Sequence, residues 1–270
     1  IETCHRNNID AIVAIGGDGT FRGATDLSIR GIPTIGVTGS IDNDITATDY
    51  TVGFDTAMNT VLECVDRLRD TCESHARCNV VEVMGRDCGE IALKTGIASG
   101  AVAIAIPEVP FDEDAAIARI KAAKADGKRG MLVIVSEGVF TADGKPYSEV
   151  LAKKIGAETG VETKFARLAH IVRGGNPTLR DRLTATEMGV FAVDLLLDGK
   201  SDAIVAEIDG KIVSTDIRFA LTTDKMYKKK LKDGQLDGFS AEEIDAMKAI
   251  CAKREADIKR LYDISLGLCR

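Results

Sequence analysis

AIVAIGGDGT, residues 11–20, joins a short apolar run to a turn that contains three glycines and one aspartate. Near-continuous apolar runs of this length are typical of strands that are covered on both faces, as in a parallel sheet. Glycines after such a strand allow a tight turn and let backbone N–H groups approach phosphate oxygens. The stretch therefore indicates an α/β fold with a candidate phosphate-binding turn, although a strand-to-helix turn without a ligand gives the same pattern.

The same pattern recurs along the chain. Bounded apolar runs of similar length occur at 32–37, 79–84, 102–106 and 131–135. Segments with apolar residues at helical spacing lie between them, for example from Met58 to Leu68,. Strands that alternate with helices predict βαβ units and an α/β sandwich architecture.

Two features near the C-terminus have other signatures. The pair Asp209-Gly210 lies inside the apolar-polar run 203–216, which predicts a tight antiparallel hairpin,. Ser240 is followed three residues later by Glu243, and this capping-box spacing predicts the start of a final helix,.

Composition limits the possible classes of protein. The 270 residues are 45% hydrophobic and 29% charged, which is ordinary for a globular protein,. A formal charge of −7 argues against broad binding to nucleic acid or anionic membranes,. Seven cysteines without C-x-x-C spacing favour reduced thiols in a cytosolic enzyme,. The chain starts with Ile1 and enters directly into a helical pattern, so we expect a native N-terminal segment to be missing.

A second loop, Gly39-Ser40-Ile41-Asp42-Asn43-Asp44, follows the next predicted strand. Both loops are therefore expected at the same edge of the sheet. Two carboxylates this close repel each other unless a cation or hydrogen-bond donors offset them. Phosphoryl transfer to a hydroxyl needs a metal-phosphate clamp and a carboxylate that accepts the proton. Two such loops favour a kinase, whereas one alone would equally fit a turn rich in Asp and Asn.

Three further loops carry polar groups next to glycines. Met84-Gly85-Arg86-Asp87 and Ser136-Glu137-Gly138 each follow a predicted strand, and His170-Ile171-Val172-Arg173-Gly174-Gly175 comes later in the chain. Arginine guanidinium groups match phosphate oxygens in a bidentate way, which makes Arg86 and Arg173 candidate phosphate ligands. His170 is expected to join them, because basic groups beside glycine turns suit anion binding.

In this order the loops resemble the phosphofructokinase family. The matching motifs are GGDGT at 16–20, GSIDNDI at 39–45, DRLRDT at 66–71, VVEVMGRDCG at 80–89, PEV at 107–109 and HIVRGG at 170–175. The resemblance extends to about residue 220 and implies two similar three-layer α/β sandwich domains with mostly parallel sheets and an active site in the cleft between them. The expected segments are an ATP and Mg²⁺ domain at 1–120, a sugar-phosphate domain at 121–230 and a helical tail at 231–270.

The resemblance also implies a reaction: the γ-phosphoryl group of ATP is transferred to the 1-hydroxyl of fructose 6-phosphate, in glycolysis. Asp42 matches the catalytic base, Asp44 the second carboxylate that organises metal and substrate, and Arg86 the group that stabilises the transferring phosphoryl. Asp18 matches the Mg²⁺ ligand. The phosphate cradle for ATP is expected to include Gly17, Asp18, Gly19 and Thr20.

The sugar phosphate has its own set of expected ligands. By resemblance they are Ser40, Ile41, Asp42, Arg77, Met84, Gly85, Arg86, Glu137, Lys164, His170 and Arg173. Glu137 is expected to bind sugar hydroxyls, and His170 and Arg173 the 6-phosphate. Arg77 and Lys164 are expected to cross from a neighbouring subunit, which implies a homo-oligomer, and a homotetramer is expected. Lys164 stands where family members usually have arginine, so it keeps the charge but loses the planar fork.

Several alternatives stay open from the sequence. Gly19 and Gly39 stand where pyrophosphate-dependent relatives typically have Asp and Lys, which favours ATP over pyrophosphate as donor. NAD kinases and diacylglycerol kinases share the glycine turn but not the later loops. A non-catalytic regulatory subunit of the same fold remains an alternative, because the N-terminal GGDAPG-like turn of the family is absent and ATP binding by this chain alone is expected to be weak. Cytoplasmic location is expected, and Arg69, Glu108 and Lys128 are candidate effector ligands.

Overall fold

The computed structural model describes residues 1–268 and contains two compact units. Unit 1 comprises Ile1–Phe54 and Pro177–Ala256, and unit 2 comprises Asp55–Asn176 and the residues from Asp257 onward. The units are discontinuous along the chain and do not follow the expected divisions at 120 and 230. The reason is that strands far apart in sequence pair within one sheet, so a compact unit gathers two separate stretches. Which ligand each domain binds stays a prediction.

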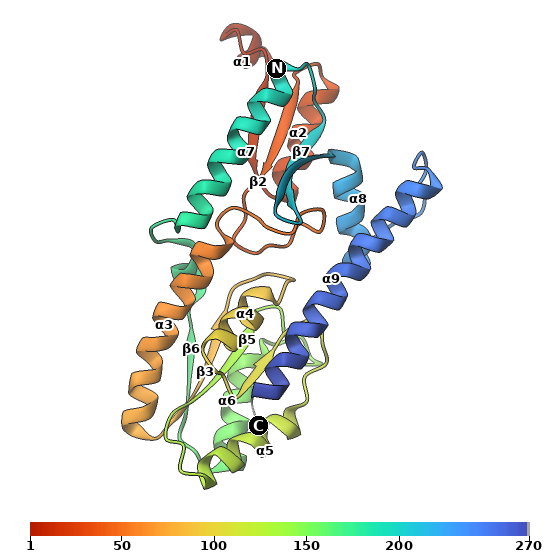
Figure 1. Cartoon of the computed structure of the whole chain (residues 1–270). Coiled ribbons are helices and arrows are strands. Elements are labelled where there is room, and N and C mark those ends of the chain that lie inside the picture. The colour runs from red at the N-terminus through yellow and green to blue at the C-terminus, as the bar shows by residue number, and fades with distance from the viewer. Residues whose placement is uncertain (269–270) are drawn as a thin grey trace. The chain divides into compact units, whose positions relative to one another are not determined.

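Unit 1 is built on a four-stranded sheet (Figure 1). Its strands lie in the order β1 (Ile12–Gly16), β2 (Thr34–Thr38), β7 (Ala203–Ile208) and β8 (Lys211–Asp216). The first three strands are parallel, and β7 and β8 form an antiparallel hairpin. The helices that belong wholly to this unit are α1 (Glu2–Arg6), α2 (Asp18–Ile29), α7 (Leu179–Leu197) and α8 (Ile217–Tyr227).

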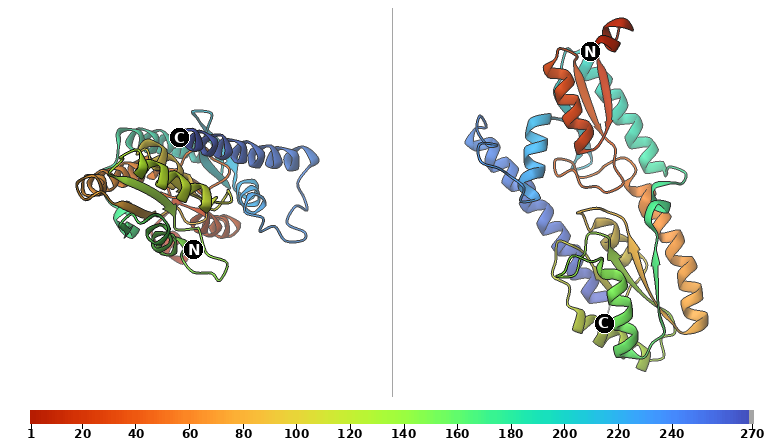
Figure 2. Two further views of the ribbon diagram at one scale, coloured as in Figure 1. Left: turned by 90° about the horizontal axis from the view of Figure 1, so that it is seen from below. Right: turned by 180° about the vertical axis from the view of Figure 1, so that it is seen from behind.

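Helices cover both faces of this sheet, as the view from behind in Figure 2 shows for α2 and α7. On one face, Phe21 and Ala24 of α2 and Ala220 of α8 pack against Ile204 of β7. On the other face, α7 residues such as Met188 pack against the β2 and β7 side chains. This three-layer arrangement explains why the strands read as almost continuous apolar runs.

Unit 2 has a second four-stranded sheet in which every pairing is parallel. The strand order is β4 (Ala103–Ala105), β5 (Met131–Ser136), β3 (Cys78–Val83) and β6 (Thr163–Arg167). The helical elements are α4 (Glu90–Ala98), α5 (Glu113–Ala125), α6 (Tyr147–Thr159) and the short 3₁₀ helix η1 (Ala169–Arg173). Helix α3 (Phe54–His75) lies in this unit apart from its first residue, and α9 (Ala241–Leu268) has residues in both units.

The predicted α/β class with mostly parallel sheets is confirmed, and so are the local signals. Asp209 and Gly210 have φ of 50° and 72° at the tip of the β7–β8 hairpin. At the start of α9, Ser240 N donates to Glu243 Oε2 at 2.7 Å, and Glu243 N donates to Ser240 Oγ at 3.2 Å. Strand β6 was not predicted from sequence, because its half-exposed side chains form no apolar run.

Two observations concern the class of protein. The cysteines at 4, 64, 72, 78, 88 and 251 are free thiols. Of the helices formed by residues 1–268, none has the length and apolar character needed to cross a membrane.

Candidate active site

The GGDGT turn links β1 to α2 at the carboxyl end of the strand. Gly17 precedes the first residue of α2, and Asp18 lies in its first turn. A Cβ on Gly16 would lie 2.2 Å from Thr20 Oγ1, so the close packing of this turn requires glycine. A Cβ on Gly17 or Gly19 would meet no atom within 4 Å. The turn therefore has free space beside the N-terminus of a helix, where backbone N–H groups favour anions.

The GSIDND loop lies directly beside this turn. Gly16 and Thr38 are register partners in the parallel β1–β2 pair, and Gly39 N donates to Gly16 O at 3.0 Å. The two glycine-and-aspartate loops therefore share one edge of the sheet, as predicted. This edge, at the carboxyl ends of parallel strands, is where open α/β sheets commonly bind ligands.

Hydrogen bonds to its backbone hold the second loop in place. Ser40 N donates to Val52 O at 3.0 Å, and Thr51 Oγ1 donates to Ser40 O at 2.6 Å. Asn43 has a φ of 50°, in the left-handed region, and its backbone carbonyl accepts a hydrogen bond from the Arg254 guanidinium of α9. Hydrogen bonds thus fix the loop between Ser40 and Val52 at both ends and at Asn43.

Both carboxylates of this loop are largely buried. Asp42 is 7% exposed and Asp44 is 6% exposed. The backbone N–H of Asp42 donates to Ser40 Oγ at 3.2 Å, which ties the aspartate to the start of its own loop. A carboxylate with a fixed position and little contact with water is suited to accept a proton from a bound hydroxyl.

Lys228 and Asp224 lie beside the candidate site and were not predicted from the sequence. Lys228 Nζ lies 2.9 Å from Asp224 Oδ2 and 3.5 Å from Asp44 Oδ2. Asp224 also accepts from Thr46 Oγ1 at 2.9 Å. Burial acts to lower the pKa of Lys228, but the Asp224, Asp44 and Asp18 carboxylates outweigh it and raise that pKa above its usual value. The acidic loops therefore have a partly buried ammonium as a neighbour.

One carboxylate oxygen suits a metal ion. Asp18 Oδ2 accepts from Arg22 at 2.5 Å, whereas the buried Oδ1 has no hydrogen-bond partner among residues 1–268. Within residues 1–268, no group of three or more His, Cys, Asp or Glu side chains is arranged to hold a metal ion. Mg²⁺ is usually held by only one or two carboxylates, with phosphate oxygens and water as its other ligands. Asp18 therefore fits a magnesium ion that arrives with a phosphate ligand.

In unit 2, the Met84-Gly85-Arg86-Asp87 loop and the Ser136-Glu137-Gly138 loop are a second pair of closely packed loops. Glu137 Oε1 accepts from Gly85 N at 3.2 Å and from Arg86 N at 2.9 Å. A Cβ on Gly85 would lie 2.4 Å from Cys88 O, and one on Gly138 would lie 2.4 Å from Arg86 O. Met84 is buried and Arg86 is exposed, so this pair of loops presents a guanidinium to solvent.

The predicted phosphate ligands His170 and Arg173 both lie on η1, and both are exposed. Leu168 N donates to Glu82 O at 3.1 Å, which anchors the start of this segment to β3. The structure thus brings an imidazole and a guanidinium onto one short turn next to Gly174 and Gly175, as the spacing predicted.

Arg77 and Lys164 are held together by a residue that was not predicted. Glu162 Oε2 lies 2.7 Å from Arg77 Nε, and Glu162 Oε1 lies 3.0 Å from Lys164 Nζ. These hydrogen bonds, first from Arg77 and then from Lys164, lower the pKa of Glu162. The two cations therefore share one counter-ion.

The candidate effector ligands have structural contacts of their own. Arg69 donates to Ser99 O, and Glu108 Oε1 accepts from Gly89 N at 2.8 Å, at the start of α4. Lys128 is exposed. A role in effector binding stays a prediction for all three.

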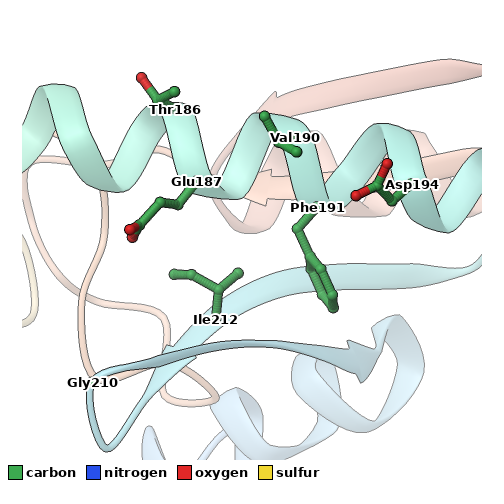
Figure 3. Close-up of a pocket in the computed structure, with 7 residues that line it drawn as sticks. All are labelled: Thr186, Glu187, Val190, Phe191, Asp194, Gly210 and Ile212. Carbon is green, nitrogen blue, oxygen red and sulfur yellow. The ribbon is translucent and has the colours of Figure 1, made fainter.

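A groove of about 500 Å³ lies between α7 and the β7–β8 hairpin (Figure 3). Its lining includes Glu187, Phe191 and Asp194 of α7 and Ile212 of β8. None of the predicted site residues lines this groove, so it is separate from the loops described above.

These loops and sheets define an α/β protein with a candidate phosphate-binding turn. The sequence model of the family described as Phosphofructokinase matches residues 1–196, and the chain belongs to this family. It is 49% identical over 221 residues to "ATP-dependent 6-phosphofructokinase" of Brevibacillus brevis, covering 82% of this chain and 67% of the relative. It is 44% identical over 230 residues to the protein of the same name from Clostridioides difficile, covering 85% and 70%.

Solved structures agree with the fold. Phosphofructokinase from Saccharomyces cerevisiae matches with a TM-score of 0.78 at 28% identity, and the match covers 94% of this chain and 35% of the yeast chain. The Pichia pastoris phosphofructokinase in the T-state matches with a TM-score of 0.79 at 29% identity, covering 99% and 30%. This chain thus spans about two thirds of the curated relatives and about a third of the yeast chains. The predicted family and the predicted class of phosphotransferase are confirmed by these relatives.

Proposed function

We propose that this chain transfers the γ-phosphoryl group of ATP to the 1-hydroxyl of fructose 6-phosphate, as the names of its relatives suggest. The observation that carries the proposal is the 3.0 Å hydrogen bond from Gly39 N to Gly16 O. It places the glycine turn, with its open space for phosphate, beside the loop with the buried carboxylates.

Asp42 is proposed as the general base. Its fixed, 7% exposed carboxylate would accept the proton of the sugar 1-hydroxyl as the oxygen attacks the γ-phosphorus,. The bond from the γ-phosphorus to the bridging oxygen then breaks, and ADP leaves. Catalysis in this reaction class consists mainly of positioning and charge stabilisation. Arg86 is proposed to stabilise the equatorial oxygens, and Asp44 to help organise the site.

The donor would lie on the 17–20 turn, with Gly17, Gly19 and Thr20 as its phosphate cradle. Asp18 would hold Mg²⁺ through its partnerless Oδ1. When bound, this ion neutralises charge on the phosphates. The small residues at Gly19 and Gly39 favour ATP over pyrophosphate. Similarity to pyrophosphate-dependent phosphofructokinases, such as that of Marinobacter aquaeolei at 23% identity, concerns the fold alone.

Ser40, Ile41 and Asp42 are proposed as ligands of the acceptor, and the other proposed ligands belong to loops of unit 2. Glu137 is proposed to bind sugar hydroxyls beside Met84 and Gly85, and the exposed His170 and Arg173 to bind the 6-phosphate. Arg77 and Lys164 are proposed to reach the same phosphate in a neighbouring subunit of a homotetramer. Location in the cytoplasm fits a glycolytic enzyme of this kind.

The test is a coupled assay for fructose 1,6-bisphosphate with ATP or pyrophosphate as donor. It is run on this chain and on a version extended with the residues of the Brevibacillus brevis relative that this chain does not match, because the match covers 67% of that relative. We expect ATP-dependent product that Asp42→Ala abolishes. Turnover only with pyrophosphate would overturn the choice of donor. No turnover by either version would favour a regulatory subunit.

A further inference from the structure

Lys228 is a partly buried cation whose position is fixed by its own helix. It follows directly on α8, and its Nζ lies 2.9 Å from the carboxylate of Asp224, one turn earlier. Thr46, three residues beyond Asn43, donates to that same carboxylate from both its hydroxyl, at 2.9 Å, and its backbone N–H, at 3.4 Å. The C-terminus of a helix also favours a positive charge. The ammonium therefore has a fixed location beside the GSIDND loop.

From this location the ammonium faces the acidic loops. Its distance to Asp44 Oδ2 is 3.5 Å, longer than its distance to Asp224, so the lysine is anchored on Asp224 and reaches toward Asp44. The Lys228 side chain is 16% exposed, and at low exposure a charge is screened less by salt and water,. Any ion that approaches Asp44 or Asp18 meets this positive charge.

A fixed ammonium acts in opposite directions on two forms of the metal. A free divalent cation is repelled by it, so the affinity of Asp18 and Asp44 for free metal falls. A metal-polyphosphate complex carries a net negative charge, so the same ammonium attracts it. One unit charge a few ångströms from a bound divalent ion corresponds to a change in affinity of at least about tenfold, even at dielectric constants close to that of water.

We propose that Lys228 is a specificity-determining residue that reserves Asp18 and Asp44 for a divalent cation bound to polyphosphate and disfavours the free cation. Asp224 is a positioning residue, because it acts by holding Lys228 in place. The inference rests on the proposed function for the identity of the donor, but the charge argument applies to the site itself.

A purely structural lysine would behave differently from a specificity residue. If Lys228 served only to anchor α8 to the loop, its removal would loosen the site and weaken the binding of free metal and of metal-polyphosphate alike. If it selects between the two forms, its removal strengthens the binding of free metal and weakens that of the complex. The opposite signs separate the two roles.

The experiment compares the wild type with Lys228→Met, Lys228→Gln and Lys228→Arg. Free Mn²⁺ is titrated by electron paramagnetic resonance, and the binding of Mg·ATP and Mg·pyrophosphate is measured by calorimetry without sugar. Asp18→Asn identifies the Mn²⁺ that binds at this site. Circular dichroism shows which variants fold. If one of the two neutral variants misfolds, the other still gives the comparison.

We expect the neutral variants to bind Mn²⁺ at least about tenfold more tightly and the metal-polyphosphate at least about tenfold more weakly, with Lys228→Arg close to the wild type. Mn²⁺ binding that is unchanged or weakened in the neutral variants would overturn the inference. The preference between Mg·ATP and Mg·pyrophosphate shows which polyphosphate is the donor. A chain that shows this binding pattern but no turnover would disprove the proposed function and leave the inference standing.

Discussion

The Tyr50 hydroxyl donates a 2.5 Å hydrogen bond to Asp181 Oδ1, which ties the end of the Asp42 loop to the first turn of α7. The same carboxylate oxygen accepts from Gly53 N at 2.7 Å. Tyr50 and Asp181 are each 2% exposed, and the Arg180 guanidinium lies 4.0 Å from the centroid of the Tyr50 ring. A residue remote in sequence therefore fixes the loop that carries the proposed base.

Removal of the Tyr50 hydroxyl tests the contribution of its hydrogen bond to Asp181. We expect Tyr50→Phe to lower the free energy of unfolding by about 2 kcal/mol, because a buried hydrogen bond to a charged acceptor is lost. Urea denaturation measures the change. Thr141→Val is the matched control, since its hydroxyl bonds only exposed groups, and it should cost less. A Tyr50→Phe protein as stable as the wild type would show that the bond does not hold the loop.

Gly16 and Gly19 give a matched pair of substitutions in one turn. Gly16→Ala would bring its Cβ to 2.2 Å from Thr20 Oγ1, and we expect a loss of about 1–3 kcal/mol,. Gly19 lies in α2 with open space around it, so Gly19→Ala should fold with equal or slightly higher stability,. If the turn is the phosphate cradle, Gly19→Ala should nevertheless raise the KM for ATP. Thermal denaturation measures the stability of both variants, and the coupled assay measures the KM for ATP. Equal losses of stability in Gly16→Ala and Gly19→Ala would contradict the conclusion that only Gly16 is closely packed.

Arg173 tests the proposed site for the 6-phosphate. It is exposed on η1, so its removal should leave the fold intact. We expect Arg173→Ala to raise the KM for fructose 6-phosphate about 10- to 100-fold, and Arg173→Lys to recover part of the loss, because lysine keeps the charge without the bidentate fork. Arg182→Ala, on the exposed first turns of α7, is the control. An unchanged KM in Arg173→Ala would remove this residue from the site.

The ion pair between Glu113 and Lys154 predicts a pH dependence of stability. Burial alone would raise the pKa of Glu113, but hydrogen bonds from Lys154 and Tyr147 outweigh it and hold this pKa below 4.5. A carboxyl whose pKa is lowered in the folded state contributes stability above its ordinary pKa and loses it as the pH falls through the folded value. The difference in Tm between the wild type and Glu113→Gln should therefore be constant from about pH 7 to 5 and shrink below about pH 4.5. A difference that persists at pH 3 would contradict this origin.

The placement of the candidate site's loops in unit 1 could be predicted because these loops follow strands. Asp18 and Asp42 each come shortly after an apolar run, and parallel strands bring such loops to one edge of a sheet. The hairpin at Asp209 and the capping box at Ser240 were predicted from residues close together in the sequence, and both were confirmed.

The unpredicted residues act through contacts that exist only in the folded protein. Asp181, Asp224 and Lys228 stand in ordinary helical sequence, and nothing near them in the chain indicates a site. The role of Glu162 as a shared counter-ion likewise depends on the folded sheet, because the pairing of β6 with β3 places Lys164 near Arg77. The discontinuous units escaped prediction for the same reason, since β2 meets β7 only in the folded sheet.

The central claim is that a phosphoryl group passes from ATP to the 1-hydroxyl of fructose 6-phosphate with Asp42 as the base. The most direct measurement uses ATP labelled in the γ-phosphate, with aldolase cleavage of the product to locate the label, on the wild type and on Asp42→Asn, with and without the relative's unmatched residues. We predict that the label appears in the fragment containing C1, and that Asp42→Asn slows its transfer by about 10²- to 10⁴-fold while fructose 6-phosphate still binds. Label elsewhere, or equal rates for Asp42→Asn and the wild type, would contradict the account.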